Sequence, residues 1–150
     1  MARIGFIGAS GLMGHGMARN LLRKGHRLGL TVHRNRSRVA DLLEAGALEA
    51  GSAAQLAAGS DVVFLCVTGT PEVEALFLAP DGLLAQPRKG LVVVDCSTSE
   101  PSSTARLREL CEPHQVALVD APLARSAAEA EAGRLNVMRA RSSWKRLCAK

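Results

Sequence analysis

Short apolar segments alternate with amphipathic segments along most of this 150-residue chain. DVVFLCV (61–67) and GLVVVD (90–95) are continuously apolar, which is typical of strands buried on both faces of a sheet. Other stretches place apolar residues at helical spacing, as Met13, Met17 and Leu21 do. Strands that alternate with helices predict parallel βαβ units, and therefore an α/β fold with right-handed crossovers.

The alternation continues as far as Met138, where the regular pattern stops. We expect strands at 3–7, 28–33, 61–67, 90–95, 116–120 and 134–138. We expect helices at 12–24, 37–45, 52–58 (capped by Ser52), 71–78, 101–111 and 127–132. The sequence thus predicts one domain over residues 1–138 and a tail of unrelated composition over 139–150.

Charge is concentrated at the end of the chain. Residues 139–150 hold five of the 19 Lys and Arg residues and no Asp or Glu, and the formal net charge is +5. The first 138 residues are therefore neutral. A neutral body with a short basic end is not the electrostatic footprint of a nucleic-acid-binding domain, so we expect no nucleic-acid partner.

The chain carries no signal for a membrane or for an oxidising compartment. No apolar run approaches the ~20 residues that span a bilayer, and the N-terminus lacks the pattern of a secretory signal. Cys66, Cys96, Cys111 and Cys148 are widely spaced, without a CxxC pair. We therefore expect a cytoplasmic protein with no metal site and no disulfide framework, in which Cys66 and Cys96 are buried thiols.

A glycine-rich segment, GFIGASGLMG (5–14), joins the first expected strand to the first expected helix. Its glycines, Gly8, Gly11 and Gly14, would allow a sharp turn and let the backbone approach a pyrophosphate at a helix N-terminus. The spacing is one residue longer than GxGxxG, and a turn that needs glycine only for packing is the alternative. Its position in a βαβ unit favours a dinucleotide site.

The segment after the second expected strand reads HRNRSR (33–38) and has no acidic residue to bind a ribose 2′-hydroxyl. Arg34, Arg36 and Arg38 are suited instead to a 2′-phosphate, because a guanidinium forms paired bonds to phosphate oxygens. The alternative is a solvated basic start of a helix. We predict a preference for NADPH over NADH.

Four stretches together resemble the β-hydroxyacid dehydrogenases, the group that contains 3-hydroxyisobutyrate dehydrogenase and is related to 6-phosphogluconate dehydrogenase. They are GFIGASGLMGHGMARNL from Gly5, NRS at 35–37, VDCSTSEP at 94–101 and VDAPLARSAAEAEAGRLNVM at 119–138. The resemblance covers residues 1–138 and implies a Rossmann-type, doubly wound, mainly parallel sheet. It also implies an oxidoreductase that transfers a hydride between nicotinamide and a small 3-hydroxy acid or aldehyde. Homo-oligomers are expected for the full-length form.

The resemblance assigns site residues by position. It implies contacts with the pyrophosphate from Gly8, Ala9, Ser10, Gly11, Leu12, Met13 and Gly14. It implies that Asn35, Arg36 and Ser37 contact the adenosine ribose. It places Val67 and Thr68 in a loop that lies along the cofactor, and Ser97 and Thr98 near the nicotinamide. Ser97 would also contact the substrate, together with Ala124, Arg125 and Ser126. The residue types alone allow another interpretation for Ser97 and Thr98, as caps of the helix that begins near Pro101.

The chain also departs from the family pattern. The family's DAPVSGG loop reads DAPLARS (120–126) here, so Arg125 either pairs with an acidic substrate or is merely exposed. The resemblance implies that the family's all-helical C-terminal domain and its catalytic lysine would follow the residues matched here, and neither Lys145 nor Lys150 falls in that lysine's motif. We therefore assign no catalytic residue and expect a truncated cofactor domain that is inactive alone. The alternative is a non-catalytic module that binds NADPH as a sensor or recruits a partner.

Overall fold

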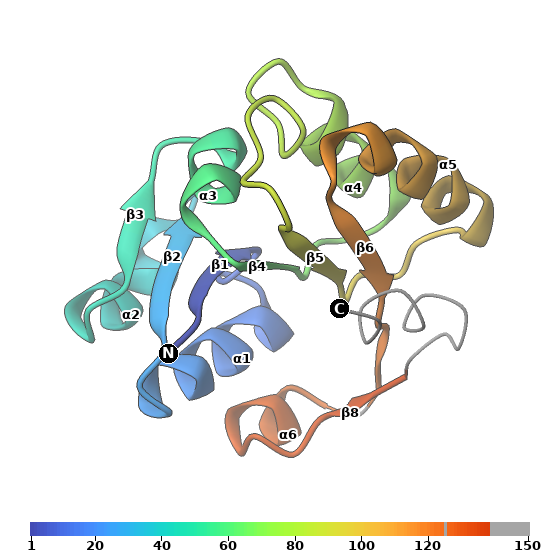
Figure 1. Ribbon diagram of the computed structural model, residues 1–150. Coiled ribbons are helices and arrows are strands. Elements are labelled where there is room, and N and C mark those ends of the chain that lie inside the picture. Colours follow the sequence, from blue (N-terminus) through green and yellow to red (C-terminus); the bar gives the residue numbers. More distant parts are fainter. Residues whose placement is uncertain (125, 139–150) are drawn as a thin grey trace.

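The computed structural model describes residues 1–124 and 126–138, and within them a six-stranded parallel sheet forms the centre (Figure 1). Its strand order is β3-β2-β1-β4-β5-β6. The strands are β1 (Arg3–Ile7), β2 (Arg27–Thr31), β3 (Leu48–Ala50), β4 (Val62–Leu65), β5 (Val92–Asp95) and β6 (Ala117–Asp120). The order reverses between β1 and β4, and this reversal opens a crevice at the carboxyl ends of the strands in doubly wound folds.

Helices cover both faces of the sheet, as Figure 1 shows. On one face lie α1 (Leu12–Arg23), α2 (Ala40–Glu44) and α6 (Ala127–Glu131). On the other lie α3 (Ala53–Gly59), α4 (Thr70–Leu78) and α5 (Pro101–Cys111). The parallel α/β fold expected from the alternation of segments is thereby confirmed, and so is the Rossmann-type, doubly wound sheet that the family resemblance implies. No helix of the described residues has the length and apolarity needed to cross a membrane.

The apolar strands are buried because each supplies side chains to both helical layers. Val63 and Leu65 of β4 are fully buried in the cluster under α3, α4 and α5. Phe64, between them, faces the other layer and stacks on Phe6 of β1, with 6.0 Å between ring centroids. The run at 61–67 is therefore continuously apolar because its strand is covered on both faces, as its pattern indicated.

Most expected elements form near their expected bounds, and the first strand and the helix from Pro101 match them. Ser52 caps α3 as predicted, because its Oγ accepts a hydrogen bond from the Gln55 amide at 3.1 Å. The helix expected at 37–45 is instead a 3-10 turn, η1 (Arg36–Val39), followed by the short α2.

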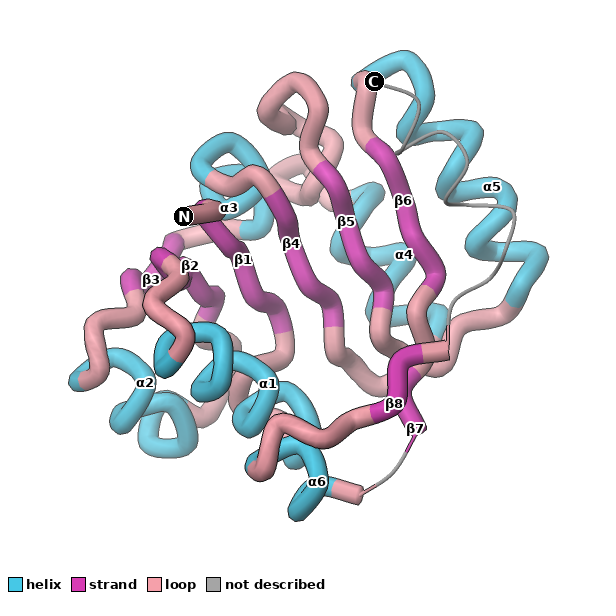
Figure 2. Tube along the Cα trace, turned by 60° about the horizontal axis from the view of Figure 1, so that its bottom comes forward, coloured by secondary structure: helices cyan, strands magenta, loops and turns pink. Residues whose placement is uncertain are grey.

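Four short elements lie outside the regular alternation. β3 was not predicted, nor was β7 (Leu123–Ala124). The strand expected at 134–138 forms as β8 (Asn136–Val137), which pairs antiparallel with β7 and not with the large sheet. Figure 2 shows this small ribbon beside α6, past the carboxyl end of β6. A second 3-10 turn, η2 (Glu112–His114), follows α5.

Candidate functional site

The turn between β1 and α1 is closed by its own backbone. The Gly11 amide donates a hydrogen bond to the Gly8 carbonyl oxygen at 3.0 Å, and Gly8 has a φ of +95°, a conformation that favours glycine. A Cβ on Gly8 would lie 2.1 Å from the Cys66 carbonyl oxygen, and a Cβ on Gly14 would lie 2.2 Å from the Gly8 carbonyl oxygen. The fold itself therefore requires glycine at positions 8 and 14.

Gly11 differs from its two neighbours in the pattern. Its φ is −77°, which any residue adopts, and a Cβ there would lie 3.2 Å from the Gly8 oxygen, a much looser contact than those at Gly8 and Gly14, which needs a shift of a few tenths of an ångström. It stands directly before α1, whose first amides have no partner within the helix. Packing thus explains two of the three glycines, whereas the third keeps a helix N-terminus open to close approach from outside.

A cavity of about 790 Å³ opens in front of this turn, at the carboxyl ends of β1, β2 and β4. The turn forms one wall, and the loop after β4 and one side of α4 form others. This is the crevice where doubly wound sheets bind dinucleotides. Its lining includes the predicted residues Gly8, Ser10, Gly11, Leu12, Met13, Gly14, Val67 and Thr68.

Several lining residues were missed by the sequence reasoning. They are Ile7, Thr31, Val32, His33, Gly51, Ser52, Ala53, Cys66, Glu72, Ala75, Leu76, Ala79, Asp81 and Gly82. Thr31 to His33 could have been found, because Thr31 ends β2 beside the glycine turn and the other two follow it directly. Those from α4 and the residues after it carry no motif, and only the packing of α4 against the sheet brings them to the cavity.

The remaining predicted residues lie outside this lining. Ala9 is fully buried beneath the turn. On the expected adenosine side, the Ser37 hydroxyl donates to Asn35 Oδ1 at 2.8 Å, and Arg36 Nη1 lies 2.6 Å from Glu49 Oε2. Arg36, the residue expected at a 2′-phosphate, thus pairs with a carboxylate of β3. That partner was invisible in the sequence because β3 itself was not predicted.

The segment after β5 is held by side-chain hydrogen bonds. Ser97 is buried, and its Oγ accepts a bond from the Val67 amide at 3.0 Å. Asp95, 1% exposed, accepts bonds from the Ser97 amide at 2.9 Å and the Ser99 hydroxyl at 2.7 Å. Ser97 therefore ties this turn to the loop that lines the cavity.

Neither Ser97 nor Thr98 acts as the helix cap considered as an alternative. The N-cap residue of α5 is Glu100, which makes no side-chain capping bond. Thr98 is exposed beside the loop after β4, and its carbonyl oxygen would lie 3.5 Å from a Cβ on Gly69.

Of the other residues expected at the substrate, Ala124 ends β7 and Ser126 directly precedes α6. Arg125 lies outside the described residues.

Two cysteines follow neighbouring strands at the same edge of the sheet. Cys96 is buried as predicted, whereas Cys66 is half-buried and lines the cavity. Burial raises the pKa of the Cys96 thiol to about 12 and raises the pKa of Cys66 as well, with the nearby Asp95 charge acting in the same direction. Both groups are therefore neutral thiols near pH 7, and neither is poised as a nucleophile.

Burial also raises the pKa of Asp120, the first residue of the DAPLARS loop. The neighbouring Asp95 charge adds to this effect, and the Arg108 guanidinium opposes it. Asp95 and Asp120 are paired in register on β5 and β6, which explains the repulsion.

Comparison with known proteins agrees with this geometry. The profile of the family described as the NAD binding domain of 6-phosphogluconate dehydrogenase matches residues 3–146. The chain belongs to this family. Its known members include dehydrogenases, so the chain is the nucleotide-binding part of an oxidoreductase family.

This NAD binding domain is similar in sequence and structure to the corresponding parts of several dehydrogenases and related proteins. The NAD-dependent L-serine dehydrogenase of Pseudomonas aeruginosa is 39% identical over 138 residues, which are 92% of this chain and 46% of that protein. The structure of 3-hydroxyisobutyrate dehydrogenase from Salmonella typhimurium superposes with a TM-score of 0.84 and 28% identity, over 98% of this chain and 51% of that one. The structure of Psf3, solved with NADP⁺ and 2-OPP, superposes with a TM-score of 0.82 and 28% identity, over 96% of this chain and 51% of that one. The chain spans about half the length of the curated relatives it matches.

Proposed function

We propose that this NAD binding domain binds NADPH in preference to NADH. In the full-length form it would serve a dehydrogenase that transfers a hydride between nicotinamide and a small 3-hydroxy acid or aldehyde. The observation that carries the proposal is Gly11, which is less tightly packed than Gly8 and Gly14 and which lines a cavity of about 790 Å³ at the start of α1. A pyrophosphate fits there, because free amides and the helix dipole favour an anion.

Residues on either side of the turn would hold the rest of the cofactor. Arg34, Arg36 and Arg38 follow β2 and carry the positive charge that suits a 2′-phosphate. Val67 and Thr68 would lie along the middle of the cofactor, while Ser97 and Thr98 would face the nicotinamide. Substrate would meet Ser97 together with Ala124, Arg125 and Ser126. The nicotinamide supplies hydride chemistry when the cofactor is bound.

We expect this chain alone to bind cofactor without turning over a substrate. Proton transfer to or from the substrate oxygen needs a positioned group of suitable pKa. The thiols that lie at this edge of the sheet are neutral near pH 7, and we assign no described residue to that role. Consumption of NADPH by this chain with any small aldehyde or β-keto acid would contradict the expectation.

Gly11→Ala tests the cofactor site directly. The new methyl group should weaken NADPH binding by about tenfold or more, because it occupies the closest approach to the turn, while the free energy of unfolding changes by less than about 1 kcal/mol. Fluorescence titration measures the affinity, and urea unfolding measures the stability. Gly59→Ala is the matched control, since a Cβ there meets nothing within 4 Å.

The same titration separates the two cofactors. In the unchanged chain, NADPH should bind more tightly than NADH. Equal affinities would contradict the preference, and unaltered NADPH binding by the Gly11→Ala variant would contradict the placement of the pyrophosphate at this turn.

A further inference from the structure

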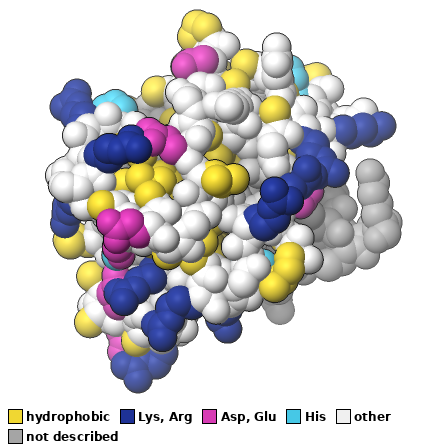
Figure 3. Space-filling view, turned by 90° about the vertical axis from the view of Figure 1, so that its left-hand side faces the viewer, with side chains coloured by type: hydrophobic (Ala, Val, Ile, Leu, Met, Phe, Trp, Pro, Cys, Tyr) yellow, Lys and Arg dark blue, Asp and Glu magenta, His cyan; other side chains and the backbone are white. Residues whose placement is uncertain are grey.

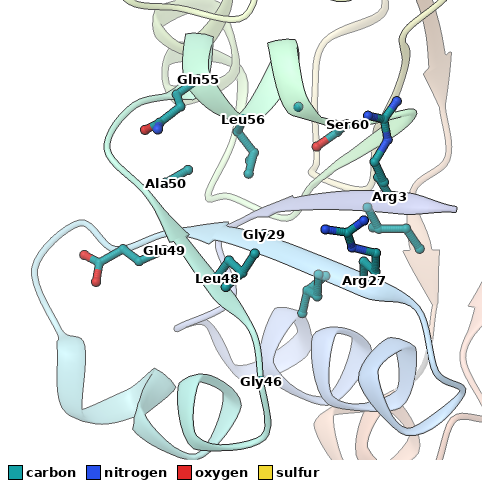
Figure 4. Close-up of a pocket in the computed structure, with 13 residues that line it drawn as sticks. Arg3, Arg27, Gly29, Gly46, Leu48, Glu49, Ala50, Gln55, Leu56 and Ser60 are labelled. Carbon is teal, nitrogen blue, oxygen red and sulfur yellow. The ribbon is translucent and has the colours of Figure 1, made fainter.

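The carboxylate of Glu49 faces the segment that is expected to select the cofactor. Glu49 lies in β3, in register with Leu30 near the end of β2, and its Oε2 atom is 2.6 Å from Nη1 of Arg36. Figure 4 shows Glu49 projecting from β3 on the side away from Arg3 and Arg27. An acidic group from the edge strand thus meets an arginine of the HRNRSR segment.

This contact distinguishes Arg36 from its neighbours. Within residues 1–124 and 126–138, neither Arg34 nor Arg38 forms an ion pair with a carboxylate. Arg36 does not line the 790 Å³ cavity, whereas Glu49 lines a smaller hollow of about 400 Å³ bounded by β1, β2, β3 and α3. The ion pair therefore holds the guanidinium at the edge of the sheet.

We propose that Glu49 limits the preference of this site for NADPH over NADH by competing with the 2′-phosphate for Arg36. This inference rests on the proposed function. A phosphate monoester carries a charge of about −1.5 to −2 at pH 7, so it is attracted by Arg36 and repelled by the Glu49 carboxylate. To bind the phosphate, Arg36 must leave its partner, and Glu49 then remains nearby as an unpaired negative charge.

The exposure of the pair shows that the competition is moderate. The Arg36 and Glu49 side chains are 65% and 37% exposed, and ion pairs of this kind are weak because water screens them. On the side of the molecule formed by β3 and α2, basic and acidic side chains lie next to one another (Figure 3), so no uniform positive field draws in the phosphate. Glu49 therefore reduces the preference for NADPH without abolishing it.

The test is the isosteric variant Glu49→Gln, titrated with NADPH, NADH, 2′,5′-ADP and 5′-AMP. NADPH and 2′,5′-ADP should bind about two- to fivefold more tightly, the range that loss of an exposed charge contact allows. NADH and 5′-AMP, which lack the 2′-phosphate, should not gain. Glu109→Gln, an exposed carboxylate of α5 on the other face of the sheet, removes the same charge at a distance and should leave all four affinities unchanged.

Arg36→Ala separates this inference from the proposed function. If Arg36→Ala leaves NADPH affinity unchanged, the assignment of Arg36 to the 2′-phosphate fails, and the inference fails with it. If Arg36→Ala weakens NADPH while Glu49→Gln does not strengthen it, only the role of Glu49 is overturned. In the double variant the gain from Glu49→Gln should vanish, and a gain that persists there would overturn the route through Arg36.

Discussion

The turns that follow β1 and β5 lie at the same edge of the sheet but are held in different ways. The turn after β1 is fixed by backbone packing, with Gly8 and Gly14 in contacts that leave no room for a Cβ. The turn after β5 is fixed by side-chain hydrogen bonds that converge on Asp95. The first arrangement keeps backbone amides accessible, whereas the second uses its polar groups internally. We therefore expect an anion to bind at the first turn, and the second turn to position residues beside it.

Gly14→Ala should cause the largest loss of stability, because it breaks the packed turn. Alanine is the better helix former by about 1 kcal/mol, but its Cβ would lie 2.2 Å from the Gly8 carbonyl oxygen. Overpacking against backbone should outweigh that gain and leave a net loss of about 2 kcal/mol. Urea unfolding measures it against Gly59→Ala, for which we expect no loss. A Gly14→Ala variant as stable as the parent would show that this turn is not held by packing.

Asp95→Ala should break the hydrogen-bonded turn at a somewhat smaller cost. Removing the buried carboxylate leaves the Ser97 amide without its acceptor, which should lower the free energy of unfolding by about 1–2 kcal/mol. Ser10→Ala is the control in the first turn, because the Ser10 hydroxyl bonds to none of the residues that the structure describes, and it should change stability by less than about 0.5 kcal/mol. Equal effects of the two substitutions would remove the contrast between the turns.

A pH-dependent contact at His15, the residue after Gly14, should give the smallest effect on stability. In α1, the ring of His15 lies 2.9 Å from the Asp41 carboxylate and 2.9 Å from the Glu131 carboxylate. Burial alone would lower the pKa of His15, but the two carboxylates outweigh it, and the pKa is raised above 6.5. The protonated form is thus favoured in the folded state.

The stability that His15 contributes should be fully present below about pH 6.5 and lost as the pH rises through the folded-state pKa. The contribution should stay below about 1 kcal/mol, because all three side chains are partly exposed. Urea unfolding at pH 5.5 and pH 8.5 should show a smaller difference for His15→Gln than for the parent. His114→Gln, an exposed histidine of η2, should leave the difference unchanged.

The sequence predicted the parts of the site that depend on neighbouring residues. A buried strand, three glycines and a helix follow one another over 20 residues, and the physical demands of that turn are local. β3 was missed because three residues with two exposed side chains, Leu48 and Glu49, show neither an apolar run nor a clear period. The Arg36–Glu49 pair and the α4 wall of the cavity depend on packing between segments that are distant in the sequence. No local sequence pattern could therefore predict them.

The contact between α1 and α6 gives the molecule a built-in reporter. Asn20 Nδ2 donates to the carbonyl oxygens of Ala130 at 3.0 Å and Glu131 at 3.1 Å, over Gly16, whose missing Cβ lets the two helices meet. Five residues are too few for an isolated helix to persist in water. The rate of hydrogen–deuterium exchange at the amides of α6 should therefore report how often α6 separates from α1. This local opening should be more frequent than opening of the sheet.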